Sequence, residues 1–226
     1  EQCRAHFRAG RRRVVVQAPC RSGKTFTFAF MAQGAASKGK RVLVMAHREA
    51  LVEQASSSFS KLGIEHGLIL SGRSSNTLPV QIGMIGTVAR RLDSIQPPDL
   101  IIIDEGHRAL GRQYRAIIDA FPAAHVLPFT ATPARTDGRG LGEIAEALVQ
   151  GPQPIELIET GDICRPRLFA PEPSADLSGI RNIDSAEGKA KAARALDRPH
   201  ITGDAIAHYR RYASGLSFVC FCSGIE

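Results

Sequence analysis

Aliphatic and β-branched residues gather in short runs that polar segments separate, as expected for buried strands joined by helices and turns. The runs predict strands at residues 14–16, 41–46, 67–70, 80–85, 100–103 and 126–129. Residues 1–12 are expected to be the end of a helix that stops at Gly10. Further helical segments are expected at 26–37, 50–62, 87–92 and 112–120, with Thr87 capping the one at 87–92. This alternation predicts an α/β fold with a doubly wound, mostly parallel sheet.

The pattern changes after about residue 151, where prolines become frequent and the alternation stops. Here we expect helices at residues 155–162, 190–196 and 201–212, and strands at 167–170 and 216–222. The last strand is strongly apolar and needs neighbours, yet the sequence ends directly after it. We therefore predict a first domain at residues 1–165 and the incomplete start of a second at 166–226. The alternative is that the last strand docks on the first sheet.

A phosphate-binding loop is predicted directly after the first strand. Backbone N–H groups in such a loop surround phosphate oxygens, and the N-terminus of the following helix adds its positive dipole end. Gly23 leaves room for the phosphate, Lys24 is expected to neutralise the outer phosphates, and the Thr25 hydroxyl to hold a magnesium ion. The predicted cofactor-binding residues are Ala18, Pro19, Cys20, Arg21, Ser22, Gly23, Lys24 and Thr25.

Two neighbouring carboxylates follow the apolar strand at residues 100–103. Asp104 is positioned to hold the same magnesium ion as Thr25, and Glu105 to orient and deprotonate an attacking water. Hydrolysis of a γ-phosphate needs these two roles filled by separate groups. The simpler interpretation is an acidic turn that ends a strand, with His107 as an ordinary polar loop residue.

The composition is that of a globular protein, with 43% hydrophobic residues. Its formal net charge of +7 suits a polyanionic partner, although charge alone is weak evidence. The five cysteines lack the paired spacing of a zinc site and are expected to be reduced. No apolar run approaches the roughly 18 residues that span a bilayer, and the arginine-rich N-terminus lacks the apolar core of a signal peptide. We therefore expect a cytoplasmic protein.

Four segments in this order resemble the motifs of superfamily 2 helicases of the DEAD/DEAH-box type. Residues 18–25 resemble motif I, 45–54 motif Ia, 104–107 (Asp-Glu-Gly-His) motif II, and 130–133 (Thr-Ala-Thr-Pro) motif III. Residues 85–90 resemble the segment that follows motif Ia. The whole chain is similar to bacterial and phage members, including those related to the motor subunits of type III restriction enzymes.

The resemblance implies two RecA-like lobes, the first a P-loop NTPase domain, with ATP between them and nucleic acid across both. It assigns Lys24 to the β- and γ-phosphates, Thr25 and Asp104 to the magnesium ion, and Glu105 to the role of base. It implies that His107, Thr130 and Thr132 relay the nucleotide state to the second lobe. It also places three residues near the nucleic-acid backbone, namely His47, Arg48 and Thr87; the simpler interpretation is that these are solvated loop residues.

The chain departs from the family pattern at several positions. Ala18 stands where the loop usually begins with glycine, Arg21 replaces another glycine, Cys20 replaces threonine or serine, and Gly106 stands where alanine or cysteine is commoner. The motif that reads adenine is expected just before residue 1, and motifs V and VI, with the family's arginine fingers, do not occur in the sequence. Because such a finger contributes several orders of magnitude in rate, we expect this chain to bind nucleotide but hydrolyse it poorly.

The function that we predict is an ATP-dependent nucleic-acid helicase or translocase that uses ATP and Mg²⁺. DNA is favoured over RNA because the Ala-His-Arg-Glu form of motif Ia resembles the DNA-directed relatives. One alternative is the motor subunit of a restriction enzyme. A second is a nucleotide-gated nucleic-acid-binding module without useful turnover.

Overall fold

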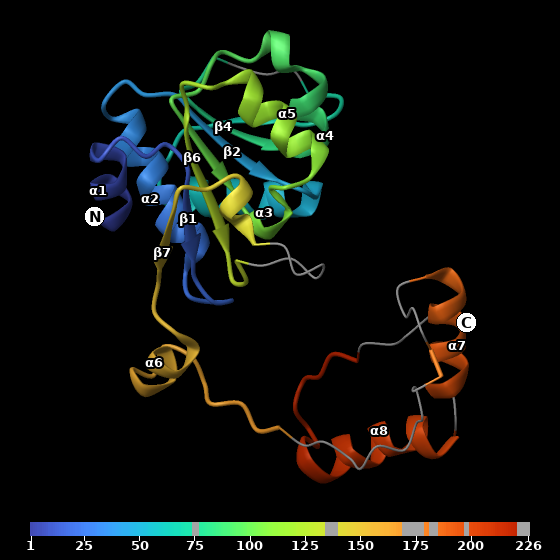
Figure 1. The fold of residues 1–226 in the computed structure, drawn as a ribbon. Helices are drawn as coiled ribbons and strands as arrows, with labels where there is room; N and C mark the ends of the chain where they lie inside the picture. Colours follow the sequence, from blue (N-terminus) through green and yellow to red (C-terminus); the bar gives the residue numbers. More distant parts are fainter. Residues whose placement is uncertain (74–76, 134–139, 169–178, 181–184, 197–198, 221–226) are drawn as a thin grey trace. The chain divides into compact units, whose positions relative to one another are not determined.

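The protein is described by a computed structural model that covers all residues except 74–76, 134–139, 169–178, 181–184, 197–198 and 221–226. It divides into two compact units, Glu1–Arg165 and Pro166–Glu226. The first unit contains the sheet and all the motifs named above (Figure 1).

A seven-stranded sheet in the order β3-β4-β2-β5-β6-β1-β7 forms the centre of the first unit. Every neighbouring pair in the sheet is parallel. The strands are β1 (Val14–Gln17), β2 (Val42–Ala46), β3 (Gly67–Ile69), β4 (Val80–Met84), β5 (Leu100–Ile103), β6 (His125–Thr130) and β7 (Ala147–Gln150). The prediction of a doubly wound parallel sheet is confirmed.

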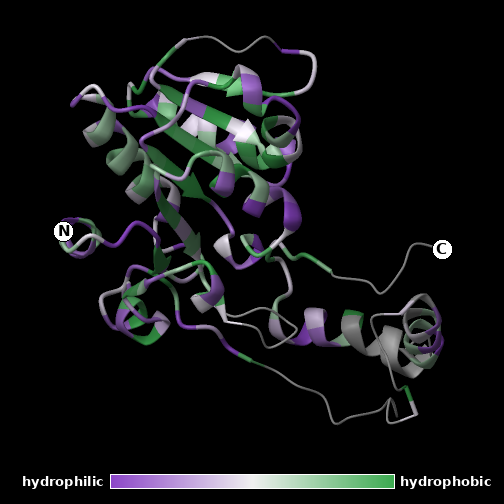
Figure 2. Cartoon of the chain, turned by 45° about the horizontal axis from the view of Figure 1, so that its top comes forward, coloured by the Kyte–Doolittle hydropathy of each residue, from purple (hydrophilic) through white to green (hydrophobic). Residues whose placement is uncertain are grey.

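Helices cover both faces of the sheet (Figure 1). Their bounds are α1 (Gln2–Arg8), α2 (Lys24–Ala36), α3 (Glu49–Lys61), α4 (Ile85–Arg90) and α5 (Arg112–Ala120). Side chains of α1, α2 and α3 share one buried cluster with the sheet, and those of α4 and α5 share the other. The four central strands are buried on both faces, which explains their continuous apolar runs (Figure 2).

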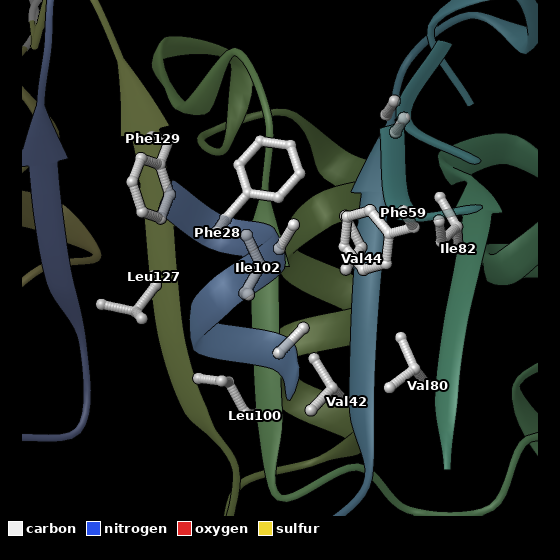
Figure 3. Close-up of a cluster of buried hydrophobic side chains, with 14 of the residues drawn as sticks. Phe28, Val42, Val44, Phe59, Val80, Ile82, Leu100, Ile102, Leu127 and Phe129 are labelled. Atoms are coloured by element: carbon white, nitrogen blue, oxygen red, sulfur yellow. The ribbon is translucent and has the colours of Figure 1, made fainter. Parts of the chain in front are cut away.

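Phe28 is the centre of the core between α2 and the sheet. Its ring lies 5.7 Å from that of Phe129 and 6.2 Å from that of Phe59, measured between centroids. Figure 3 shows these rings among aliphatic side chains from β2, β4, β5 and β6. Because α2 begins directly after the phosphate-binding loop, this packing also fixes where that loop lies.

Two features of the first unit were not predicted. The edge strand β7 pairs only with β1, and its residues are alternately half-buried and exposed, so its sequence carries a weak hydrophobic signal. Thr87 does not cap a helix; it lies inside α4, where it is buried. Ile85 and Val88, which lie before and after it in the sequence, pack into the core. The helix therefore begins at Ile85, two residues before Thr87.

The described residues after β7 contain three helices, α6 (Pro154–Glu159), α7 (Ala186–Leu196) and α8 (Pro199–Tyr212). The prediction of a strand at 216–222 is wrong for residues 216–220, which have no regular structure, and residues 221–222 lie outside the described part. Phe218 and Val219 are exposed. A strand needs hydrogen-bonding neighbours, and the described part of the second unit contains none. Residues 167 and 168 are likewise not in a strand, and 169–170 lie outside the described residues.

Among the described residues, no helix is both long enough and apolar enough to cross a membrane.

Phe28→Ala is expected to lower the free energy of unfolding by about 3–5 kcal/mol, because the cavity it leaves lies against two other rings. Phe30 lies on the same helix but is 62% exposed, so Phe30→Ala is the matched control and should change stability by less than about 0.5 kcal/mol. Urea denaturation of both variants measures the difference. Equal effects would contradict the described packing of α2.

Candidate functional site

Apart from Thr87, which lies in α4 after β4, the predicted site residues follow the carboxyl ends of four adjacent strands in the order β2, β5, β6 and β1. His47 and Arg48 follow β2, Asp104 to His107 follow β5, Thr130 ends β6, and the phosphate-binding loop follows β1. Parallel strands place their carboxyl ends at one edge, so segments up to about a hundred residues apart in sequence converge there. Ala18 N–H donates a hydrogen bond of 2.9 Å to the Thr130 carbonyl, which joins the loop to the end of β6.

The loop at residues 18–25 is held together by its own polar groups. The Ser22 hydroxyl donates to the Pro19 carbonyl at 2.7 Å. The Lys24 ammonium folds back and donates to the carbonyls of Ala18 and Pro19, each at 3.3 Å. Lys24 is also the first residue of α2, so its charge lies where the backbone N–H groups of the helix start are unpaired. The loop therefore presents positive charge and N–H donors together.

Arg21 takes a backbone conformation that favours glycine. Its φ is 64°, in the left-handed region, and Gly23 two residues later has φ 79°. Arg21, which replaces one of the family's glycines, thus keeps the glycine-like path of the chain and carries a side chain on it. An L-residue in this region costs about 1–2 kcal/mol. The strain lies in the loop that is predicted to bind phosphate.

Asp104 and Glu105 lie at the end of β5 in a second strained turn. The Asp104 N–H donates to the Met45 carbonyl of β2 at 3.0 Å, and the Glu105 N–H donates to Asp104 Oδ1 at 3.0 Å. Glu105 has φ 53° and ψ 51°. Burial raises the pKa of the Asp104 carboxyl, while the nearby charges of Lys24 and His107 oppose that rise. The charge of the loop lysine therefore acts on the carboxylate that follows β5.

Gly106 has a packing reason to lack a side chain. A Cβ at this position would lie 2.6 Å from the Cβ of Pro128 in β6. Pro128 itself sits opposite Ile103 in the parallel pairing of β5 with β6. Gly106, another departure from the family pattern, is therefore matched by a neighbouring strand that comes unusually close to the turn.

His107 joins the carboxylate turn to the end of β6. Its Nδ1 lies 3.3 Å from the Thr130 hydroxyl and 3.4 Å from Glu105 Oε2. The buried Thr130 hydroxyl donates to the Thr132 carbonyl at 2.9 Å and accepts from the Thr132 N–H at 3.1 Å. His107, Glu105, Thr130 and Thr132 form one network.

The residues predicted to contact nucleic acid differ in exposure. Arg48 is exposed directly before α3, while His47 is half-buried and Thr87 is buried. Burial and then the charge of Arg108 lower the pKa of His47, and its Nδ1 has no hydrogen-bond partner among the described residues. Within α4, the Thr87 hydroxyl accepts a long hydrogen bond of 3.5 Å from Arg90.

Two residues near the carboxylates were missed. Arg108 directly follows the motif, and its charge affects both His47 and Tyr114. Tyr114 is buried, which raises its pKa to about 12, and its hydroxyl has no partner among the described residues. The position of Arg108 next to the Asp-Glu-Gly-His segment was a usable signal, whereas the spacing of Tyr114 indicates only a core residue of α5.

Among the described residues, no group of three or more histidine, cysteine, aspartate or glutamate side chains is arranged to hold a metal ion. The predicted magnesium site does not require one. Its donors are a threonine hydroxyl, one carboxylate and phosphate oxygens, which is the oxygen-rich mixture that Mg²⁺ binds with nucleotides.

Comparison with known proteins identifies relatives of this chain. The family model for the res subunit of type III restriction enzymes matches residues 1–135. A 51.5 kDa protein of a Lactococcus phage is 28% identical over 94% of the chain, and the putative ATP-dependent helicase IRC3 of Saccharomyces cerevisiae is 26% identical over 80%. The ATP-dependent DNA helicase RecG of Acidithiobacillus ferridurans is 31% identical over 70%. These alignments cover 44%, 29% and 26% of the relatives, so the chain spans less than half of their length.

Solved structures share the fold at lower identity. The UvsW helicase of bacteriophage T4 matches 62% of this chain and 55% of its own, with a TM-score of 0.53 and 19% identity. The Hef helicase domain of Pyrococcus furiosus matches 62% of this chain and 34% of its own, with a TM-score of 0.54 and 22% identity. The sheet described above is therefore the RecA-like fold of helicase domains.

Arg21→Gly is expected to raise the free energy of unfolding by up to about 1 kcal/mol, because glycine removes the strain but is freer in the unfolded chain. Arg21→Ala is the matched control, since it removes the charge but keeps the strained φ, and it should give no such gain. Thermal or urea unfolding compares them. A glycine variant no more stable than the alanine variant would contradict the strain at this position.

Gly106→Ala is expected to destabilise the protein by about 1–3 kcal/mol, because the added methyl group would overlap Pro128. Gly140→Ala is the control, because its φ is −77° and a Cβ there meets nothing within 4 Å. Chemical denaturation measures both, and the crystal structure of Gly106→Ala should show the turn displaced. Tolerance of alanine at 106 with an unchanged turn would refute the close approach.

Proposed function

The chain belongs to the family of type III restriction enzyme res subunits, relatives of superfamily 2 helicases, and from this we propose that it is the ATP-binding part of a nucleic-acid motor. The motor would use ATP hydrolysis to translocate on DNA or to unwind it. This proposal concerns the first unit, which carries the four motifs.

The convergence of the phosphate-binding loop with the carboxylates is the observation that carries the proposal. Ala18 bonds to Thr130, Thr130 contacts His107, and the charge of Lys24 reaches Asp104. A single basic turn or a single acidic turn occurs in many proteins by chance. Their meeting at one edge of a parallel sheet supports a shared ligand that has both phosphates and a metal ion.

We assign the phosphates to the N–H groups of residues 18–25 and to Lys24. The Lys24 ammonium now donates to two loop carbonyls and would exchange them for phosphate oxygens, which are stronger acceptors. Thr25 and Asp104 would hold Mg²⁺, which supplies charge neutralisation on the β- and γ-phosphates. Because burial raises the pKa of Asp104, its ionised form gains more from a nearby cation than an exposed aspartate would.

Glu105 is the proposed base that orients and deprotonates the attacking water. It is one-third exposed, so water can reach it, and His107 Nδ1 lies 3.4 Å from its carboxylate. His107 also contacts Thr130, which is bonded to Thr132. We assign to this network the transmission of the nucleotide state, because a shift of Glu105 changes the partner of His107 and hence of Thr130.

Nucleic acid is assigned to the end of β2 and to α4, through His47, Arg48 and Thr87. Arg48 is exposed and offers its guanidinium to phosphate, while Thr87 is buried and would contribute through its backbone. DNA is favoured over RNA because the RecG relatives are named as DNA helicases. The cytoplasm is the compartment we propose.

A second candidate function is the motor of a restriction enzyme, which the family description favours. A third is a nucleotide-gated nucleic-acid-binding module without useful turnover, which the strained Arg21 in the phosphate loop favours. Both motor functions require ATP hydrolysis that nucleic acid stimulates. The binding module requires only that ATP change the affinity for nucleic acid.

Lys24→Ala should weaken binding of a fluorescent ATP analogue with Mg²⁺ by at least about tenfold, because the phosphate charge loses its main partner. Lys61→Ala, on the exposed surface of α3, removes the same charge and should bind as the wild type does. Equal affinities of all three proteins would reject the loop as the nucleotide site.

Glu105→Gln should leave that affinity within a few-fold and lower DNA-stimulated hydrolysis by about a hundredfold or more, because the base is lost while the binding groups remain. Steady-state phosphate release measures this. Unchanged hydrolysis would reject Glu105 as the base. Absence of hydrolysis in the wild type, together with ATP-dependent DNA affinity, would favour the binding module over the motor.

A further inference from the structure

The amino ends of the strands carry a row of basic residues at the edge of the sheet opposite the candidate site. Arg12 and Arg13 directly precede β1, and Lys40 and Arg41 directly precede β2. Because the strands are parallel, these starts share one edge, about 13 Å from the site edge for a four-residue strand. Strands β1 and β2 are separated by β5 and β6. The pair before β1 and the pair before β2 therefore lie about 14 Å apart along this edge of the sheet.

Helix α1 and the end of α2 extend this row. The Arg4 guanidinium lies 3.8 Å from the position that a Cβ on Gly34 would occupy, in the last turn of α2. Lys38 comes four residues after Gly34, just beyond the end of α2. The Phe7 ring lies 4.4 Å from the ring of His125 at the start of β6, which fixes the other end of α1 to the same edge. We name this surface the basic edge; its members are Arg4, Arg8, Arg11, Arg12, Arg13, Lys38, Lys40 and Arg41.

The carboxylates along this row are already engaged. Asp99 accepts from Lys40 Nζ at 3.0 Å and from the Arg41 N–H at 2.9 Å. Glu146 accepts from the Arg12 N–H at 2.6 Å and more weakly from that of Arg13 at 3.4 Å. These acids neutralise backbone dipoles and one lysine, and leave most of the basic side chains with their charge exposed.

Most of the basic edge has no acidic partner in the described part of the chain. Arg4, Arg8 and Lys38 are exposed and form no ion pair there, whereas the charge of Arg41 acts on Asp99. The Arg11 guanidinium bonds to His6 Nδ1 and that of Arg12 donates to the Ala123 carbonyl, each at 2.6 Å, so both groups are oriented without an acidic partner. A row of arginines and lysines with few ion-pair partners suits the phosphates of a nucleic-acid backbone.

We propose that the basic edge is a second nucleic-acid contact, which holds a segment of duplex phosphate backbone away from the ATP edge. Its contacts are to phosphates and carry no base specificity. A duplex bound there would stay attached to the protein while the nucleic-acid contacts at the end of β2 and at α4 break and re-form during nucleotide turnover. The inference takes its partner, nucleic acid, from the proposed function; the surface itself is assigned from charge and topology.

The test uses the full chain with three substitutions, Arg8→Gln, Arg11→Gln and Lys38→Gln. These side chains are exposed and take no part in the core or the candidate site. The matched control removes the same charge elsewhere, with Lys61→Gln, Arg73→Gln and Lys191→Gln. Affinity for a fluorescent DNA duplex with a single-stranded tail is measured by anisotropy over a series of salt concentrations.

The basic-edge variant should bind at least about tenfold more weakly than the control, and the slope of log K against log salt should fall by about 2–3. Its thermal unfolding and its affinity for the fluorescent ATP analogue should equal those of the wild type. Equal affinities and slopes in the two triple variants would overturn the proposal, because they would show a response to net charge alone.

Failure of the proposed function gives a different result. It would appear as unchanged nucleotide binding in Lys24→Ala, whatever the basic edge does. If the basic-edge variant bound vesicles of anionic lipid more weakly than the wild type but bound DNA equally well, the assignment to nucleic acid would also be overturned.

Discussion

The parallel order of β2, β5, β6 and β1 is the constraint on which the rest of the structure depends. It brings together the ends of strands that are distant in sequence, and the bond from Ala18 to the Thr130 carbonyl ties the phosphate loop to β6. His107 then ties β6 to the carboxylate turn. The hydrophobic effect forms this sheet, because each central strand must be covered on both faces. The polar chemistry at its edge follows from that burial.

Both turns that carry the proposed chemistry hold a non-glycine residue at positive φ, Arg21 in one and Glu105 in the other. Strain of this kind persists only where the surroundings impose it. Here the surroundings are the rigid strand ends and the first turn of α2, whose Phe28 is locked in the core. Gly106 adds a second constraint, because its contact with Pro128 leaves no room for a side chain. Packing of the core thus determines the path of the backbone at the site.

The same parallel arrangement separates two kinds of charge. The carboxyl ends combine Lys24 with the acidic pair Asp104 and Glu105, which suits a metal–nucleotide ligand. The amino ends carry more arginines and lysines than the carboxylates Asp99 and Glu146 beside them, which suits a polyanion. Helix dipoles reinforce the separation, since α2 directs its positive end at the phosphate loop and its negative end towards Arg4. One fold therefore offers two surfaces of different chemistry at opposite edges.

The sequence alone determined the central strands, the helices between them and the turns that carry Lys24, Asp104 and Glu105, because burial on both faces and phosphate-loop chemistry leave strong local patterns. Only the tertiary structure decided the strand order, the half-exposed edge strand β7, the burial of Thr87 and the lack of a strand at residues 216–220. It also decided why Arg21 and Gly106 are tolerated. These features depend on which segments become neighbours, and a local pattern records how buried a residue is but not what lies against it.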